Sequence, residues 1–120
     1  MDSTAERTAV AQAAYFVVTG VWPLLHRRSF EAITGRKTDF WLAQCVGGLV
    51  AAVGAGIYVA HRRGRLTREV QEMAATSAAA LGALETLYAL RGRISKVYLG
   101  DAALEALFVA GWARARTNRG

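Results

Sequence analysis

The chain has one cysteine and one proline, and neither supports a protein built on disulfides or on strands and turns. A lone thiol, Cys45, cannot form an internal disulfide or a site with several cysteine ligands. Cys45 lies inside an apolar run, where a small buried hydrophobe is its expected role. Scarce proline together with abundant Ala and Gly favours helices. The sequence therefore predicts an all-α protein.

Charge is absent from two long stretches, residues 9–25 and residues 40–60. The second stretch has the length of about 20 apolar residues that crosses a bilayer core. Two further apolar segments follow, and each contains only a few charged residues. We expect an integral membrane bundle of four transmembrane helices in a single membrane domain, with spans at about residues 9–26, 40–60, 70–91 and 94–113.

The net charge of +6 does not indicate a nucleic-acid partner. The Lys and Arg residues lie in short links between apolar segments, where they meet lipid headgroups, and apolar runs of this length have no place on a DNA-binding domain. With four spans both termini share one side of the membrane, here called side A, and the other side is called side B. Side A receives eight of the 15 basic residues and side B seven. The positive-inside rule therefore assigns no orientation.

Three carboxylates lie within the third and fourth predicted spans: Glu85, Asp101 and Glu105. A helical hairpin centred on Arg93 places Glu85 and Asp101 at the same depth, about 12 Å from its tip, and Glu105 about one turn deeper. An acid at a helix centre costs about 2.5–3.5 kcal/mol on insertion scales. Three together repel unless they are protonated or paired. We expect one layer of carboxylates in the half of the membrane that faces side B.

Residues spaced three or four apart add aromatic groups to this layer. Tyr98, Asp101, Glu105 and Trp112 follow one stripe of the fourth span, and Tyr88 lies on the corresponding face of the third. His26, at the side B end of the first span, is a candidate proton carrier or lone ligand. The expected ligand-binding residues are Glu85, Asp101, Glu105, Tyr88, Tyr98, Trp112 and His26. In the alternative, Arg91, Arg93, Lys96, Thr19 or Gln12 neutralises the acids in a structural polar network.

No metal and no cofactor are expected. His26 and His61 end different spans on opposite sides of the membrane, so the two imidazoles cannot share one metal ion. Small residues form rows at four-residue spacing on the second span, which suits close helix contacts. The rows are candidates for a homo-oligomer contact and consist of Gly47, Ala51 and Ala55, and of Gly48, Ala52 and Gly56.

Two segments, "WPLLHRRSFEAITGRKTDFWL" and "LYALRGRISKVYLGDAALE", resemble those of small bacterial integral membrane proteins with four predicted helices and no assigned activity. The second segment contains both Asp101 and Glu105. The resemblance implies the four-helix architecture and no particular activity. Together with the apolar spans it leads us to expect a location in the bacterial inner membrane.

Three functions remain open. The first is binding or transport of a cationic, proton-coupled or amphipathic small molecule at the carboxylates. The second is a membrane enzyme on an apolar substrate, such as an isomerase, cyclase or epoxide hydrolase. Its catalytic residues would be Glu85, Asp101 and Glu105, with one protonated acid beside an ionised one. The third is an accessory subunit that docks through the small-residue rows.

Overall fold

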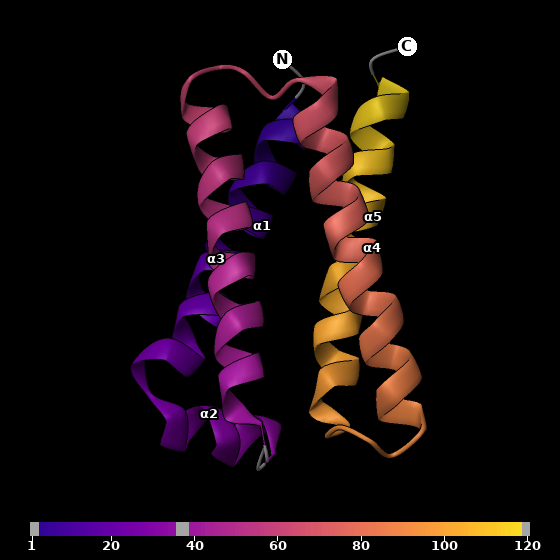
Figure 1. Cartoon of the computed structure of the whole chain (residues 1–120). Helices are drawn as coiled ribbons and strands as arrows, with labels where there is room; N and C mark the ends of the chain where they lie inside the picture. Colours follow the sequence, from indigo (N-terminus) through magenta and orange to yellow (C-terminus); the bar gives the residue numbers. More distant parts are fainter. Residues whose placement is uncertain (1–2, 36–38, 119–120) are drawn as a thin grey trace.

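The computed structural model describes residues 3–35 and 39–118, and this part of the chain is helical without strands. Four helices of similar length run along the molecule: α1 (Ser3–Leu25), α3 (Phe40–Arg62), α4 (Arg68–Leu90) and α5 (Val97–Asn118). A short helix, α2 (Arg27–Thr34), lies at the side B end (Figure 1). The predicted all-α class is confirmed.

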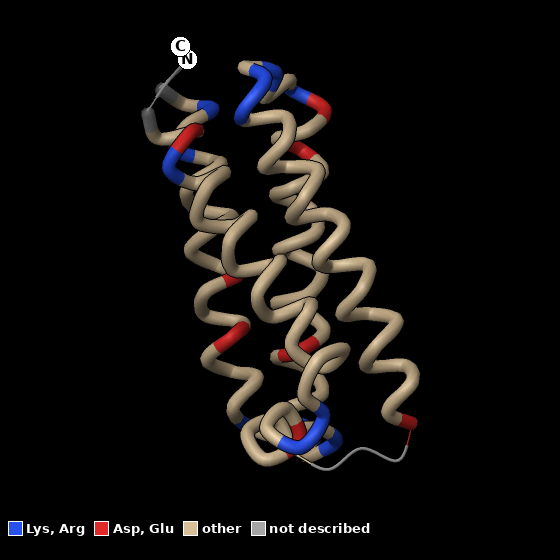
Figure 2. Tube along the Cα trace, turned by 90° about the vertical axis from the view of Figure 1, so that its left-hand side faces the viewer, with Lys and Arg blue, Asp and Glu red and all other residues tan. Residues whose placement is uncertain are grey.

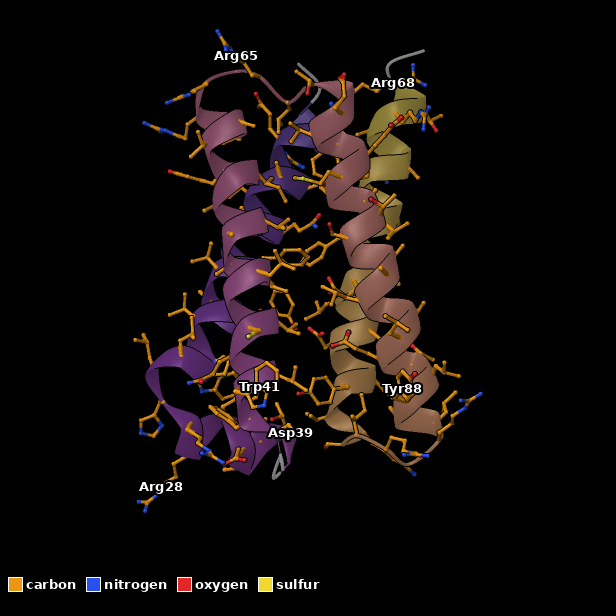
Figure 3. The ribbon with its side chains drawn as sticks, viewed as in Figure 1. Arg28, Asp39, Trp41, Arg65, Arg68 and Tyr88 are labelled. Carbon is orange, nitrogen blue, oxygen red and sulfur yellow. The ribbon has the colours of Figure 1, made fainter. Side chains whose placement is uncertain are left out.

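Three of the described helices, α1, α3 and α4, are long and apolar enough to cross a membrane. The molecule is 46 Å long, close to the roughly 40–45 Å of a bilayer with its headgroups. Lys and Arg gather at its two ends (Figure 2). The exposed side chains of Trp41 and Tyr88 lie at one level near the side B end (Figure 3), as an interfacial aromatic belt requires. These features agree with an integral membrane protein.

The helices do not coincide with the predicted spans. α1 begins at Ser3 and therefore includes polar residues that precede the apolar run. α5 begins at Val97 rather than near residue 94. Residues 91–96 form a wider turn in which Gly92 has φ +74°. α5 is not among the three candidate spans, and it contains Asp101 and Glu105 as well as Arg114 and Arg116.

The bundle consists of two helix pairs, α1 with α3 and α4 with α5. Contacts between α1 and α5 join the pairs, whereas α3 and α4 touch little although only residues 63–67 separate them (Figure 1). The first pair is close because glycines face each other. A Cβ added to Gly20 would lie 2.4 Å from the carbonyl oxygen of Gly47. The α1–α3 contact therefore depends on the absence of side chains there.

The two small-residue rows of the second span have different environments. Gly47 and Ala51 pack against Gly20 of α1 in the same chain. A Cβ added to Gly48 or Gly56 would meet nothing within 4 Å. Ala52, between these two glycines, is exposed, as is Ala55. The row of Gly48, Ala52 and Gly56 is therefore the one that faces away from the bundle.

Candidate functional site

The carboxylates of Glu85, Asp101 and Glu105 converge at the α4–α5 seam. One oxygen of each lies within 4.8 Å of the others. Glu85 and Asp101 are half-buried, and Glu105 is 1% exposed. The one-turn spacing of Asp101 and Glu105 on α5 places both on the face that meets α4. We call these three side chains the carboxylate layer.

Gly82 brings the layer together from the α4 side. A Cβ at this position would lie 3.1 Å from the Cβ of Glu105, closer than ordinary van der Waals contact. Gly82 also precedes Glu85 by about one helical turn, on the same face of α4. The missing side chain lets α5 approach α4 and directs Glu105 into the seam.

Tyr15 of α1 completes the layer from the other helix pair. Its hydroxyl donates a hydrogen bond to the Asp101 carboxylate. Its ring packs against Phe108 with centroids 5.8 Å apart. Sequence reasoning missed Tyr15, because it lies in an uncharged apolar run with no motif around it. The one feature of the sequence that could have identified it is the residue type. A tyrosine has an apolar ring and a hydroxyl that usually forms a hydrogen bond when it is buried.

The layer has no basic partner in the residues that the structure describes, where the ion pairs are Arg27–Glu31, Arg68–Glu72 and Arg116–Glu72. The expected neutralising residues Arg91, Arg93 and Lys96 are exposed near the α4–α5 turn. None of the three has a described ion pair with the layer, and long cationic side chains at a membrane surface commonly extend toward water.

The polar residues of α1 that were alternative partners are engaged elsewhere. The Thr19 hydroxyl donates to the carbonyl of Tyr15, and Gln12 binds α4 and α5. One oxygen of Glu85 and one of Glu105 are buried without a hydrogen-bond partner. A structural polar network formed by Thr19, Gln12 and the three acids would therefore leave two carboxylate oxygens without a hydrogen-bond donor.

Three negative charges this close in apolar surroundings are strongly unfavourable. Tyr15 supplies one hydrogen bond, which offsets only part of the cost at Asp101. The remaining charge must be balanced by protons or by a bound cation. This electrostatic requirement is the main property of the site.

The side A end of the layer is closed by two buried contacts. Phe16 of α1 packs edge-on against Phe108 of α5, with ring centroids 6.4 Å apart. Beyond them, the Gln12 amide donates to the carbonyl oxygen of Ala74 (2.9 Å) and accepts from the Trp112 indole (2.7 Å). Gln12 is 0% exposed, and we call these contacts the Gln12 clamp. Since Glu85 and Asp101 are only half-buried, the layer is more open toward side B.

Several residues expected in the site lie elsewhere. Trp112 is seven residues beyond Glu105, roughly 10 Å along the helix, so it shares the stripe but serves the Gln12 clamp. Tyr88 is exposed. Tyr98 is half-buried in the first turn of α5. Trp112 and Tyr88 have no described contact with the carboxylate layer.

His26 does not join the layer either. α1 ends at Leu25, two residues after Pro23, and the chain then turns into α2. His26 caps that helix, where its Nδ1 accepts from the backbone N–H of Ser29 at 3.1 Å. The imidazole is therefore exposed at the surface of side B.

A shallow apolar groove of about 440 Å³ runs between α4 and α5 on the outer surface. Its wall includes Gly82, so the groove backs onto Glu105. Thr86 is its single hydroxyl-bearing residue, and that hydroxyl is bonded to the carbonyl of Gly82. The lining residues are Ala78, Ala79, Gly82, Ala83, Thr86, Ala102, Ala106 and Val109.

No family model, curated protein or solved structure matches this chain.

Proposed function

We propose that the chain crosses the membrane four times and binds a positively charged or proton-carrying small ligand at the carboxylate layer. The length of α5 supports a fourth span, because its 22 residues extend about 33 Å. α5 packs against both α4 and α1. Its deepest acid, Glu105, is buried in the bundle and does not face lipid.

The observation that carries this function is the convergence of three acids without a basic partner in the described residues. Carboxylates in a membrane protein are costly and mark ligand or proton pathways. A cation or a proton removes that cost. The site therefore has its lowest energy when it holds positive charge.

The burial pattern supports access to the layer from side B, because Glu85 and Asp101 are only half-buried. The Gln12 clamp and the Phe16–Phe108 contact close the opposite end. A ligand enters next to Glu85 and Asp101, and Glu105 is reached last. Transport then requires a second state in which the α1–α5 contact opens toward side A.

Thermal unfolding of the purified chain in lipid nanodiscs tests this function. The probes are tetraphenylphosphonium, Na⁺ and Mn²⁺, each added to the wild type and to the triple variant Glu85→Gln, Asp101→Asn, Glu105→Gln. At least one probe should raise the unfolding temperature of the wild type and leave the triple variant unchanged. Glu69→Gln, which removes an exposed acid on side A, should respond like the wild type. Equal responses in wild type and triple variant would disprove the proposal.

The membrane enzyme is a second candidate, and the groove behind Glu105 favours it. An apolar substrate in the groove would lie near a proton-donating acid and an ionised neighbour. Conversion of a lipid-soluble epoxide, measured by mass spectrometry and lost in Asp101→Asn, distinguishes this enzyme from a ligand carrier. Conversion that persists in the variant excludes the carboxylate layer as its active site.

A further inference from the structure

The oxygens of the carboxylate layer have the spacing of one cation's coordination shell. In a Ca²⁺ site, with bonds of about 2.3–2.6 Å, opposite ligand oxygens lie about 4.6–5.2 Å apart and neighbouring ones closer. The three oxygens here lie within 4.8 Å of one another. They can therefore ligate a single ion with small side-chain adjustments.

Glu105 gives independent support for a bound ion. Its side chain is 1% exposed, and its Oε1 has no hydrogen-bond partner. Buried carboxylate oxygens nearly always have a donor or a cation beside them, and an unpartnered one needs an explanation. Because Glu105 contributes to the 4.8 Å group, its carboxylate is directed toward Glu85 and Asp101. A cation at their common centre is the partner that Glu105 lacks.

The charge of the layer favours a divalent ion. Two positive charges offset two of the three carboxylates, and a proton or the Tyr15 hydrogen bond at Asp101 moderates the third. In metal sites such second-shell donors hold a ligating carboxylate in position. Tyr15 is suited to this positioning role.

The donor atoms define the class of metal. The group contains only carboxylate oxygens, without His or Cys among the described residues. Oxygen ligands suit Mg²⁺, Mn²⁺ and Ca²⁺, whereas Zn²⁺ and Cu²⁺ prefer nitrogen and sulfur. We propose that Glu85, Asp101 and Glu105 bind one divalent cation of this oxygen-preferring class, which rests on the proposed function and specifies its ligand.

Titration of the full chain in nanodiscs with Mn²⁺ alone tests the metal site, with free Mn²⁺ measured by electron paramagnetic resonance. We expect saturable binding that Mg²⁺ or Ca²⁺ displaces. Glu105→Gln should weaken Mn²⁺ binding by at least about tenfold, since loss of even a second-shell partner costs that much. Glu69→Gln should bind like the wild type. Glu85→Gln is the second test variant, and circular dichroism verifies that each variant is folded.

The outcomes separate this inference from the proposed function. Equal Mn²⁺ binding by wild type, Glu105→Gln and Glu85→Gln overturns the metal site. So does absence of binding to the wild type. If tetraphenylphosphonium or Na⁺ then still stabilises the wild type and not the triple variant, the cationic-ligand function stands without a metal. If no probe depends on the layer, both proposals fail.

Discussion

The Tyr15 hydroxyl on α1 donates a hydrogen bond to the Asp101 carboxylate on α5, across 86 positions of sequence. This bond connects the two helix pairs at the level of the carboxylate layer. It is also the one contribution to the layer from outside α4 and α5 that the described residues show.

Replacing this phenol tests whether the contact stabilises the detergent-solubilised protein. Tyr15→Phe keeps the ring against Phe108 and removes only the donor. We expect the free energy of unfolding in detergent to fall by about 1–2 kcal/mol, as for a lost hydrogen bond to a charged group in a membrane protein. Mn²⁺ binding should weaken as well. Tyr58→Phe, at an exposed position of α3, is the control and should change neither. Equal effects of the two variants would exclude the contact.

The Gln12 clamp should contribute strongly to stability. Gln12→Leu leaves the Trp112 indole without its acceptor in a fully buried place, and it removes the side-chain donor that the Ala74 carbonyl has besides its helical hydrogen bond. We expect a loss of about 1–3 kcal/mol in chemical unfolding. Gln44→Leu is the matched control, because its amide makes one long contact of 3.5 Å with the carbonyl of Pro23. A loss as large for Gln44 would mean that the clamp has no special role.

Two glycines of the α1–α3 pair should respond in opposite directions to the same substitution. Gly20→Ala places a Cβ 2.4 Å from the Gly47 carbonyl oxygen, so we expect a loss of about 1–3 kcal/mol from overpacking. Gly48→Ala meets open space and should gain up to about 1 kcal/mol of helix propensity. Unfolding curves of both variants check this. Similar losses would mean that α3 presents a different face to α1.

The outward row of α3 is the proposed contact for a second copy of the chain. A Cβ at Gly56 would meet nothing within 4 Å, so Gly56→Leu fills the outward row and the monomer should unfold as the wild type does. If the row mediates a dimer, sedimentation equilibrium in detergent should show a weaker dimer for this variant. Ala80→Leu, at an exposed position of α4, controls for added apolar bulk. An unchanged dimer, or a monomeric wild type, would exclude this contact.

Protons and Mn²⁺ should compete for the same carboxylates. A carboxylate must lose its proton to bind a metal, so Mn²⁺ affinity should rise with pH and binding should release protons. Titrations in weakly buffered solution measure this release. The release should be smaller for Glu105→Gln, which has one titrating ligand fewer, and unchanged for Glu69→Gln. Affinity that is independent of pH would argue against carboxylate ligands.

The sequence predicted the relation of Glu85 to Asp101 and Glu105, because all three lie in one helical hairpin. Depth in a hairpin follows from counting residues from its tip, and the face follows from the helical period. A three-residue shift in the start of α5 did not separate the acids, since both helices continue past them.

Relations between distant helices could not be predicted in this way. The two glycine rows of α3 differ by one residue, about 100° around the helix, and either could face α1. Gly20 determines which row faces α1, because the absence of a side chain at Gly20 lets the Gly47 backbone approach closely. Trp112 shares the face of Asp101 and Glu105, but it lies about two turns deeper, and its partner Gln12 on the distant helix α1 could not be identified from the hairpin. The sequence does not predict the turn from α1 into α2 after Pro23, and this turn takes His26 away from the carboxylate layer.

The division of the bundle into two pairs has a consequence for any motion at the carboxylate layer. All three acids belong to the α4–α5 pair, and only Tyr15 belongs to the other. When one pair tilts against the other, the acids travel together and keep their mutual distances. Such a tilt changes the contacts that α1 makes with this pair, which are the Tyr15 hydrogen bond, the Phe16–Phe108 contact and the Gln12 clamp. A cation of the kind we propose would therefore remain with one half of the molecule, and the hydrogen bond from the other half would set how strongly it is bound.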